Sequence, residues 1–127
     1  MSSVPVPPTI PGDVNVTSIL ANKAKVTKVA VTQLTSTTTG VTANAAAGVI
    51  TMVASTLAAD ATEAFVVTCD SCSASSVVLA NGLAYTGTDS TAVITVNVVD
   101  ITEGAFTIQV GNGSAAVLDG ILTVGFL

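Results

Sequence analysis

Two cysteines, Cys69 and Cys72, form a single Cys-x-x-Cys pattern in this 127-residue chain. Such a pair can hold a metal ion, take part in thiol exchange or close a disulfide. A zinc site needs four ligands, and the chain has no second cysteine pair and no histidine. A redox pair favours a helix N-terminus, whereas this pair follows a run of β-branched residues. The sequence favours two small buried side chains at a strand end, then a disulfide, and last a metal or redox pair.

Two pairs of carboxylates also have a spacing that permits chemistry. Asp60 with Glu63, and Asp100 with Glu103, are each three residues apart. Paired carboxylates can act as general acid and base or bind Ca²⁺. We predict both pairs in polar connections between strands, where acidic side chains are mostly solvated, and no calcium-loop pattern accompanies them. We therefore assign no catalytic residue, no metal site and no cofactor.

The composition excludes several classes of function. Val, Thr, Ala and Ser make up 71 of the 127 residues, only 9% are charged, and His, Arg and Trp are absent. Histidine acid–base chemistry is therefore excluded, and three lysines against eight acids do not suit a phosphate backbone. With half of its residues hydrophobic, the chain is not of the disordered class. We expect a non-enzymatic, β-rich structural or interaction module.

The net charge of −5 is unevenly distributed along the chain. Lys23, Lys25 and Lys28 are its only cations, and residues 29–127 carry seven carboxylates. Such an acidic body repels nucleic acid and anionic membranes, so neither is an expected partner. Two interpretations of the lysines stay open: they dock on an acidic partner surface, or they solvate the start of a strand.

No membrane span or secretion signal is expected. Residues 29–59 have no charged side chain, and the mean hydropathy of the chain is +0.78. A spanning helix needs about 20 consecutive apolar residues, and Thr, Ser, Asn, Gln and Gly interrupt this segment throughout. Residues 1–5 lack the basic and apolar regions of a signal peptide.

All four prolines lie in the first eleven residues. Proline fixes φ and directs the preceding residue towards extended geometry. We therefore predict an extended, polyproline-like arm over residues 1–22 and a body over residues 23–127. An arm of this kind is expected to lie against a neighbouring subunit. The residues expected to make contacts to a subunit or partner are Pro5, Pro7, Pro8, Pro11, Lys23, Lys25 and Lys28.

Short β-branched runs alternate with turn residues after the arm. The predicted strands are residues 25–34, 49–57, 64–69, 76–79, 91–99, 105–110 and 121–127. We predict turns at residues 37–40 and at Asn81-Gly82, and one helical turn over 114–118 that Gly120 stops. Short strands at this spacing indicate an all-β fold, an antiparallel β-sandwich or jelly roll.

The predicted core is built from small side chains. Phe65, Tyr85, Phe106 and Phe126 are the only aromatic residues. A core filled mainly by Val, Ala and Leu buries little area per residue, while ordering each residue costs about 1–2 kcal/mol of backbone entropy. We therefore expect a homo-oligomer that shares its core or sheet edges.

The order of the small-residue strands carries a resemblance to a known family. Its segments are Val41-Thr42-Ala43-Asn44-Ala45, Gly48-Val49-Ile50-Thr51, Phe65-Val66-Val67, Gly104 to Val110, and Asn112 through Gly120 to Leu127. Over most of residues 25–127 this order resembles small virion proteins of tailed bacteriophages, of the head decoration or cement kind. The resemblance implies a β-sandwich, commonly a homotrimer, made in the host cytoplasm. It also implies a place on the capsid exterior, where such proteins bind the major capsid protein and clamp adjacent capsomers.

Other functions remain open. A phage tail fibre, spike or baseplate module has a similar residue texture, but a fibre usually needs a long shaft, for which 127 residues leave no room. A cellular surface or adhesive domain would need an export signal. The copy number in a virus particle separates cement from tail.

Overall fold

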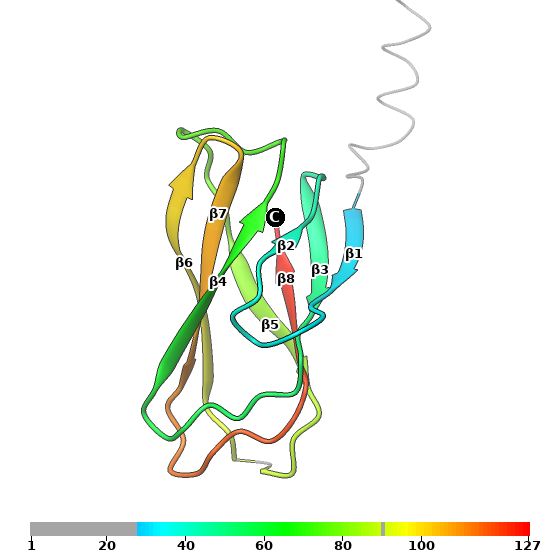
Figure 1. Ribbon diagram of the computed structural model, residues 1–127. Coiled ribbons are helices and arrows are strands. Elements are labelled where there is room, and N and C mark those ends of the chain that lie inside the picture. Colours follow the sequence, from blue (N-terminus) through cyan, green and yellow to red (C-terminus); the bar gives the residue numbers. More distant parts are fainter. Residues whose placement is uncertain (1–27, 90) are drawn as a thin grey trace, which may run out of the picture.

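The computed structural model describes residues 28–89 and 91–127, and it is all-β over this part of the chain (Figure 1). Its strands are β1 (Lys28–Thr32), β2 (Val41–Thr42), β3 (Ala47–Thr51), β4 (Thr62–Thr68), β5 (Ala80–Tyr85), β6 (Ile94–Thr102), β7 (Ala105–Asn112) and β8 (Leu122–Phe126). The described residues form no helix, and so none that is long and apolar enough to cross a membrane.

The strands form two four-stranded sheets. The first sheet has the order β1-β3-β8-β5, and the second has the order β2-β4-β7-β6. In Figure 1, β4, β6 and β7 lie on the left, and β1, β3 and β8 lie on the right. Each sheet has one parallel pair at an edge, β1 with β3 and β2 with β4, and its other pairs are antiparallel. The expectation of wholly antiparallel pairing was therefore wrong for these two pairs.

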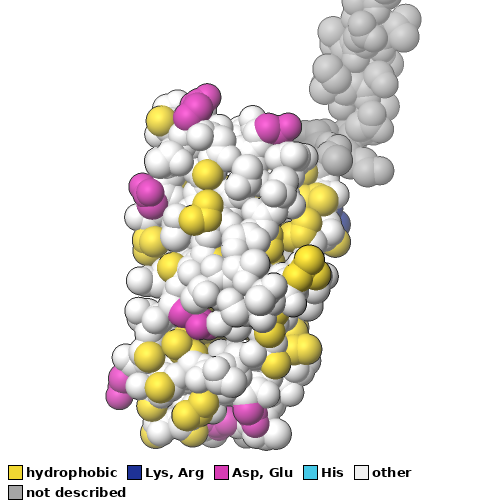
Figure 2. All heavy atoms as spheres, in the orientation of Figure 1, with side chains coloured by type: hydrophobic (Ala, Val, Ile, Leu, Met, Phe, Trp, Pro, Cys, Tyr) yellow, Lys and Arg dark blue, Asp and Glu magenta, His cyan; other side chains and the backbone are white. Residues whose placement is uncertain are grey.

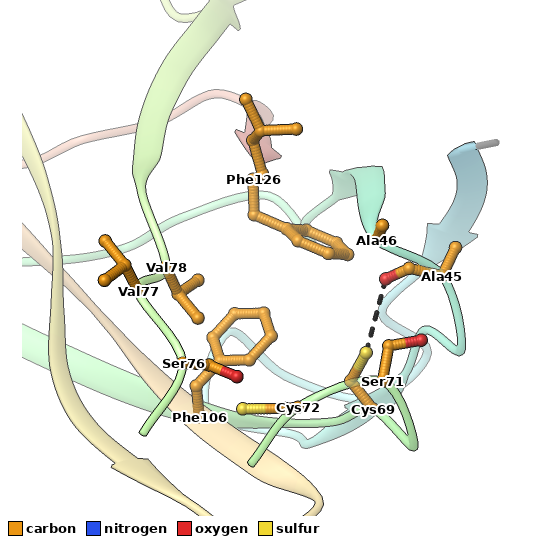
Figure 3. A pocket seen from close by; sticks show the side chains of 11 residues that line it. Ala45, Ala46, Cys69, Ser71, Cys72, Ser76, Val77, Val78, Phe106 and Phe126 are labelled. Carbon is orange, nitrogen blue, oxygen red and sulfur yellow. Dashed lines mark hydrogen bonds between the residues drawn. The ribbon is translucent and has the colours of Figure 1, made fainter. Parts of the chain in front are cut away.

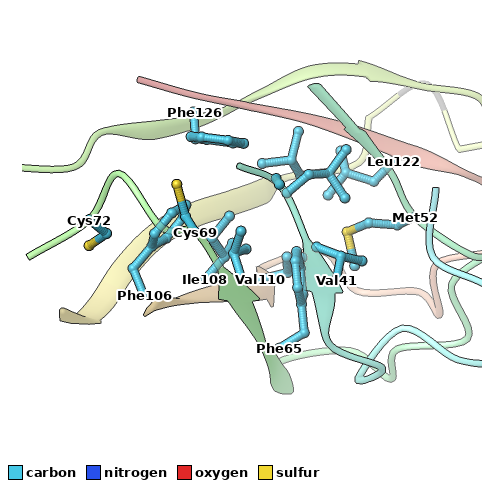
Figure 4. Close-up of a cluster of buried hydrophobic side chains, with 14 of the residues drawn as sticks. Val41, Met52, Phe65, Cys69, Cys72, Phe106, Ile108, Val110, Leu122 and Phe126 are labelled. Atoms are coloured by element: carbon cyan, nitrogen blue, oxygen red, sulfur yellow. The ribbon is translucent and has the colours of Figure 1, made fainter. Parts of the chain in front are cut away.

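Alternation of side chains along the strands produces one core (Figure 4). In the second sheet, Phe65 of β4 lies opposite Ile108 of β7, and Val67 lies opposite Phe106. All four are buried, whereas Val66 between them points away from the core. Ile50, Leu122, Val124 and Phe126 of the first sheet join the same cluster. The period of two, visible in the sequence, thus decides which face of β4 and of β7 is buried.

A glycine allows the largest rings of the core to approach the backbone. Phe126 of β8 lies opposite Gly48 of β3, and a Cβ atom at residue 48 would overlap the Phe126 ring. That ring packs against Phe106 with a centroid distance of 5.2 Å and an interplanar angle of 57°. The aromatic pair therefore joins the two sheets above a position that only glycine fits.

The Asn81-Gly82 turn and the strand at 76–79 were wrong. Asn81 and Gly82 lie inside β5 and pair with Gly125 and Val124 of β8, with a bulge between Gly82 and Ala84. The pairing continues beyond the strand ends, because the amides of Leu79 and Leu127 each donate to the other's carbonyl at 3.0 and 2.9 Å. A partner strand distant in sequence has overridden a local turn signal.

Two other predicted elements also differ. Residues 114–118 form no helical turn, because the Asn112 side chain organises this loop: its Oδ1 accepts from the Ser114 amide at 2.9 Å, and its Nδ2 donates to the Ala116 carbonyl at 2.8 Å. The strand predicted at 49–57 ends at Thr51. Beyond it, the Val53 amide donates to Oε1 of Gln33 at 3.3 Å instead of continuing a ladder.

Candidate interaction surface

The outer face of the first sheet is a shallow apolar groove. Ile50 and Val124 point into the core, so their strand neighbours Val49 and Gly125 face outwards. These two residues lie opposite each other, and Gly125 also pairs with Asn81 of β5. Because Gly125 has no side chain, the middle of this face is low. The residues that line it enclose a groove of about 510 Å³.

Exposed hydrophobic side chains form the rim of this groove. Leu79, Leu83 and Leu127 are 65%, 52% and 60% exposed, respectively, and all three line it. Leu83 lies directly beside Gly125: a Cβ atom added at Gly125 would be 3.0 Å from Cδ1 of Leu83. Monomeric proteins expose few contiguous apolar patches, so such a groove is a candidate surface for contact with a partner.

Lys28, at the start of β1, lies on the opposite wall of the same groove. It is the sole cation among the described residues, while seven carboxylates lie in that part of the chain and none of them lines the groove. In Figure 2 the acidic side chains are scattered over the visible face, and dark blue appears only at its right-hand edge. The groove therefore combines a basic side chain with an acid-free lining on a body of net negative charge.

Of the contact residues named from the sequence, the structure places one on this surface. Lys28 lines the groove, whereas Pro5, Pro7, Pro8, Pro11, Lys23, Lys25 and the whole arm over 1–22 lie outside the described residues. Sequence reasoning missed Leu79 and Leu83, because it assigned residues 76–79 to a strand that ended in a turn. The signal that could have found them is the apolar run Val77-Val78-Leu79, which continues through Leu83 without a charge.

The cysteine pair lies beside a second, smaller pocket of about 130 Å³ (Figure 3). Both thiols are free and buried. The Cys69 Sγ donates to the carbonyl of Ala45 at 3.3 Å, and the Cys72 Sγ lies 3.5 Å from the carbonyls of Thr102 and Ala105. In Figure 3 the two side chains point in different directions. Small buried side chains at a strand end, the first interpretation of this pair, match the structure.

Backbone contacts around the cysteines show what the pair holds together. The Cys69 amide donates to the Gly104 carbonyl, and the Gly104 amide donates to the Cys72 carbonyl, each at 2.9 Å. The turn after β4 is thereby fixed to the β6–β7 turn, where Gly104 has a φ of +80°. Within the described residues, no group of three or more His, Cys, Asp or Glu side chains is placed to hold a metal ion.

The two carboxylate pairs lie differently from the prediction. Glu63 belongs to β4 and Asp100 to β6, so only Asp60 and Glu103 lie in connections. Glu63 Oε2 accepts from the Thr37 hydroxyl at 2.6 Å, and Glu103 Oε2 accepts from the Ala74 amide at 3.3 Å. Each of these two carboxylates thus ties a loop to the body.

A third carboxylate, Asp119, joins the loop after β5 to the segment before β8. Asp119 accepts hydrogen bonds from the Thr88 amide at 2.9 Å, from the Thr88 hydroxyl, and from the Tyr85 hydroxyl at 3.3 Å. The Thr88 hydroxyl, followed by its amide, lowers the pKa of Asp119 below the ordinary value of 3.8. Hydrogen bonds from Thr91, first from its side chain, lower the pKa of Asp89 in the same way.

Because the pKa values of Asp89 and Asp119 are lowered in the folded protein, its stability is expected to depend on pH in the acidic range. A carboxyl whose pKa is depressed by folding stabilises the fold above its unfolded pKa, and that contribution is lost as the pH falls through the folded pKa. We expect the melting temperature to fall between about pH 5 and about pH 3, and Asp119→Asn to flatten that fall. Thermal unfolding followed by circular dichroism measures it. Asp100→Asn removes the same charge from an exposed position of β6 and serves as the control for the change in net charge. Equal slopes for Asp119→Asn and the wild type would contradict the expectation.

Comparisons of the chain with protein-family models, with curated proteins and with solved structures found no match. Function is therefore inferred from the surfaces described above and from the strand order of the sequence.

Proposed function

We propose that this protein is a non-enzymatic virion structural protein, a decoration or cement protein that binds the outside of a phage head and stabilises capsomer contacts. The apolar groove of the first sheet, with Lys28 at its edge and no acid along it, carries the proposal, because exposed hydrophobic side chains around a groove suit contact with a protein partner, here another subunit of the proposed assembly. The small-residue strand order that resembles decoration proteins supports it.

We also propose that the two four-stranded sheets pack as a jelly-roll-like β-sandwich, preceded by the proline-rich arm that the sequence predicts over residues 1–22, outside the described residues. Buried side chains of both sheets that share one cluster support the sandwich. The protein acts as a homo-oligomer, a trimer in the simplest case, whose other partner is the major capsid protein.

The charge distribution supports one orientation on the shell. In this orientation the acidic body faces solvent and the lysine-rich segment faces the coat, so no acid-rich surface is pressed against it. An exposed ion pair contributes only about 0–1 kcal/mol, so apolar contacts supply most of the binding. The three lysines act mainly on the association rate and its dependence on salt.

Copy number on the particle tests the proposal. In purified virions of a phage that encodes this chain, quantitative mass spectrometry should find hundreds of copies, and surface labelling should reach them on intact heads. A few to a few dozen copies located at the tail would overturn the cement function in favour of a fibre, spike or baseplate module. Absence from the virion would overturn both.

The lysines provide a matched biochemical test on the same heads. We expect replacement of Lys23, Lys25 and Lys28 by Gln to slow association and to flatten its dependence on ionic strength without abolishing the complex. Stopped-flow or surface binding at several salt concentrations measures the rate. An unchanged rate at every ionic strength would assign the lysines to solvation alone.

A further inference from the structure

The groove of the first sheet lacks an occupant among the described residues, and it lies where the described chain begins. Lys28, the first described residue, forms one wall, and Leu79, Leu83 and Leu127 form the other. Its floor is low because Gly125 lies at its centre. The groove is therefore open, apolar and directly beside the point at which 27 further residues join the body.

The sequence of those residues matches the groove in chemistry. Residues 1–22 contain Val4, Val6, Ile10 and other aliphatic side chains, and a single charged residue, Asp13. The groove likewise carries one charge, the ammonium group of Lys28, which is of opposite sign. The apolar segment with its one acid, Asp13, is thus complementary in character to the apolar groove with its one base, Lys28.

The segment is also long enough to cross the groove. Neighbouring strands lie about 4.8 Å apart, so the four strands of the first sheet span about 14 Å. Residues 4–11 in polyproline geometry, at about 3.1 Å per residue, extend about 25 Å. Proline removes backbone donors and pre-sets φ, so such a segment needs no strand partner and loses less entropy when it binds.

The segment next to β1 decides which copy of the chain supplies this occupant. Residues 23–28 contain no Gly, Pro, Asn or Asp to reverse the chain. A stretch of this length without a turn residue can span up to about 20 Å, enough to take residues 1–21 beyond the sheet of their own copy. To enter the groove of its own copy the chain would have to reverse between residues 23 and 28, which favours the groove of a second copy.

We propose that the groove between Lys28 and Leu83 binds residues 4–13 from a second copy of this chain. Prolines and aliphatic side chains lie along Val49 and Gly125, Leu83 closes over them, and Asp13 pairs with Lys28. This site rests on the homo-oligomer proposed above, but it requires no viral shell.

Cysteine cross-linking of the full-length chain tests the site. An affinity-tagged chain with Ile10→Cys is co-expressed with an untagged chain carrying Leu83→Cys, and Val49→Cys is a second groove position. Mild oxidation should give a covalent heterodimer on non-reducing gels, about tenfold more than with Leu34→Cys. Leu34 is the matched control because it is 87% exposed and lies outside the groove. The native Cys69 and Cys72 are buried, and each single variant alone controls for them.

Light scattering on the unmodified chain separates this site from the self-association on which it rests. An oligomer whose groove cysteines cross-link no more than Leu34→Cys would overturn the site and leave the oligomer standing. A monomer would overturn the homo-oligomer. A double variant, Ile10→Cys with Leu83→Cys, that closes only within one chain would overturn exchange between copies.

Discussion

Replacing Phe106 with Ala is expected to lower the free energy of unfolding by about 3–5 kcal/mol. The Phe106 side chain is 2% exposed, and its ring packs on Phe126 from the opposite sheet. With few aromatic residues elsewhere in the core, small Val and Ala side chains cannot fill the space that the ring would leave. Urea unfolding at one fixed protein concentration for all variants measures the loss, because the midpoint of an oligomer would depend on concentration.

Val66→Ala is the matched control for this change. Val66 belongs to β4, the strand that pairs with β7, but it lies on the exposed face opposite Thr107. Its truncation is expected to change stability by less than about 0.5 kcal/mol. A similar loss for the two variants, or a loss below about 1 kcal/mol for Phe106→Ala, would show that the ring does not join the sheets.

A second large effect is expected from Asn112→Asp, which preserves shape and removes the amide donor. Asn112 is 2% exposed, and its Nδ2 donates to the carbonyls of Leu57, Ala58 and Ala116 at 3.0, 3.1 and 2.8 Å. In the variant, a carboxylate oxygen that cannot donate would replace the amide nitrogen opposite these three carbonyl oxygens. We expect this substitution to lower the free energy of unfolding by about 3–5 kcal/mol near neutral pH.

The pH dependence of this variant gives a more specific test. Burial against carbonyls would raise the pKa of the new carboxyl in the folded state, so the folded variant binds more protons and its stability falls as the pH rises. The loss relative to the wild type should therefore be smaller near pH 4 than near pH 7, because a protonated carboxyl again donates one hydrogen bond. Asn97→Asp adds the same charge on an exposed position of β6 and should show neither the loss nor its pH dependence. A pH-independent loss at Asn112 would contradict the assigned donor role.

The all-β class followed from the sequence because its signals are local. Residues 105–110 alternate Phe106, Ile108 and Val110 with Thr107 and Gln109, and that period by itself determines which side of β7 is buried. The strands at 64–69 and 121–127 were likewise confirmed within two residues at each end. The buried cysteines at the end of β4 were anticipated in the same way, from their types and from the β-branched run before them.

The partners of the strands were decided only by the tertiary structure. Two edge pairs are parallel, and Asn81-Gly82 is paired in β5 rather than forming a turn, because β8, some forty residues later in the chain, supplies the ladder. The helical turn at 114–118 was lost to a single side chain, Asn112, whose bonds to residues 57 and 58 no local window contains. Long-range hydrogen bonds override local propensity whenever the partner is already in place.

Some features of the interaction surface follow from the sequence, and others arise only in the folded protein. The sequence by itself determined that the charge is asymmetric, that the cations gather over residues 23–28 and that the prolines precede them, since these are facts of order along the chain. Only the fold brings Lys28, Val49, Leu83 and Leu127 to one face, because they belong to or adjoin four strands that pair out of sequence order. A groove is a property of strand order and register, and single-sequence patterns specify which face of a strand is apolar but not which strands lie side by side.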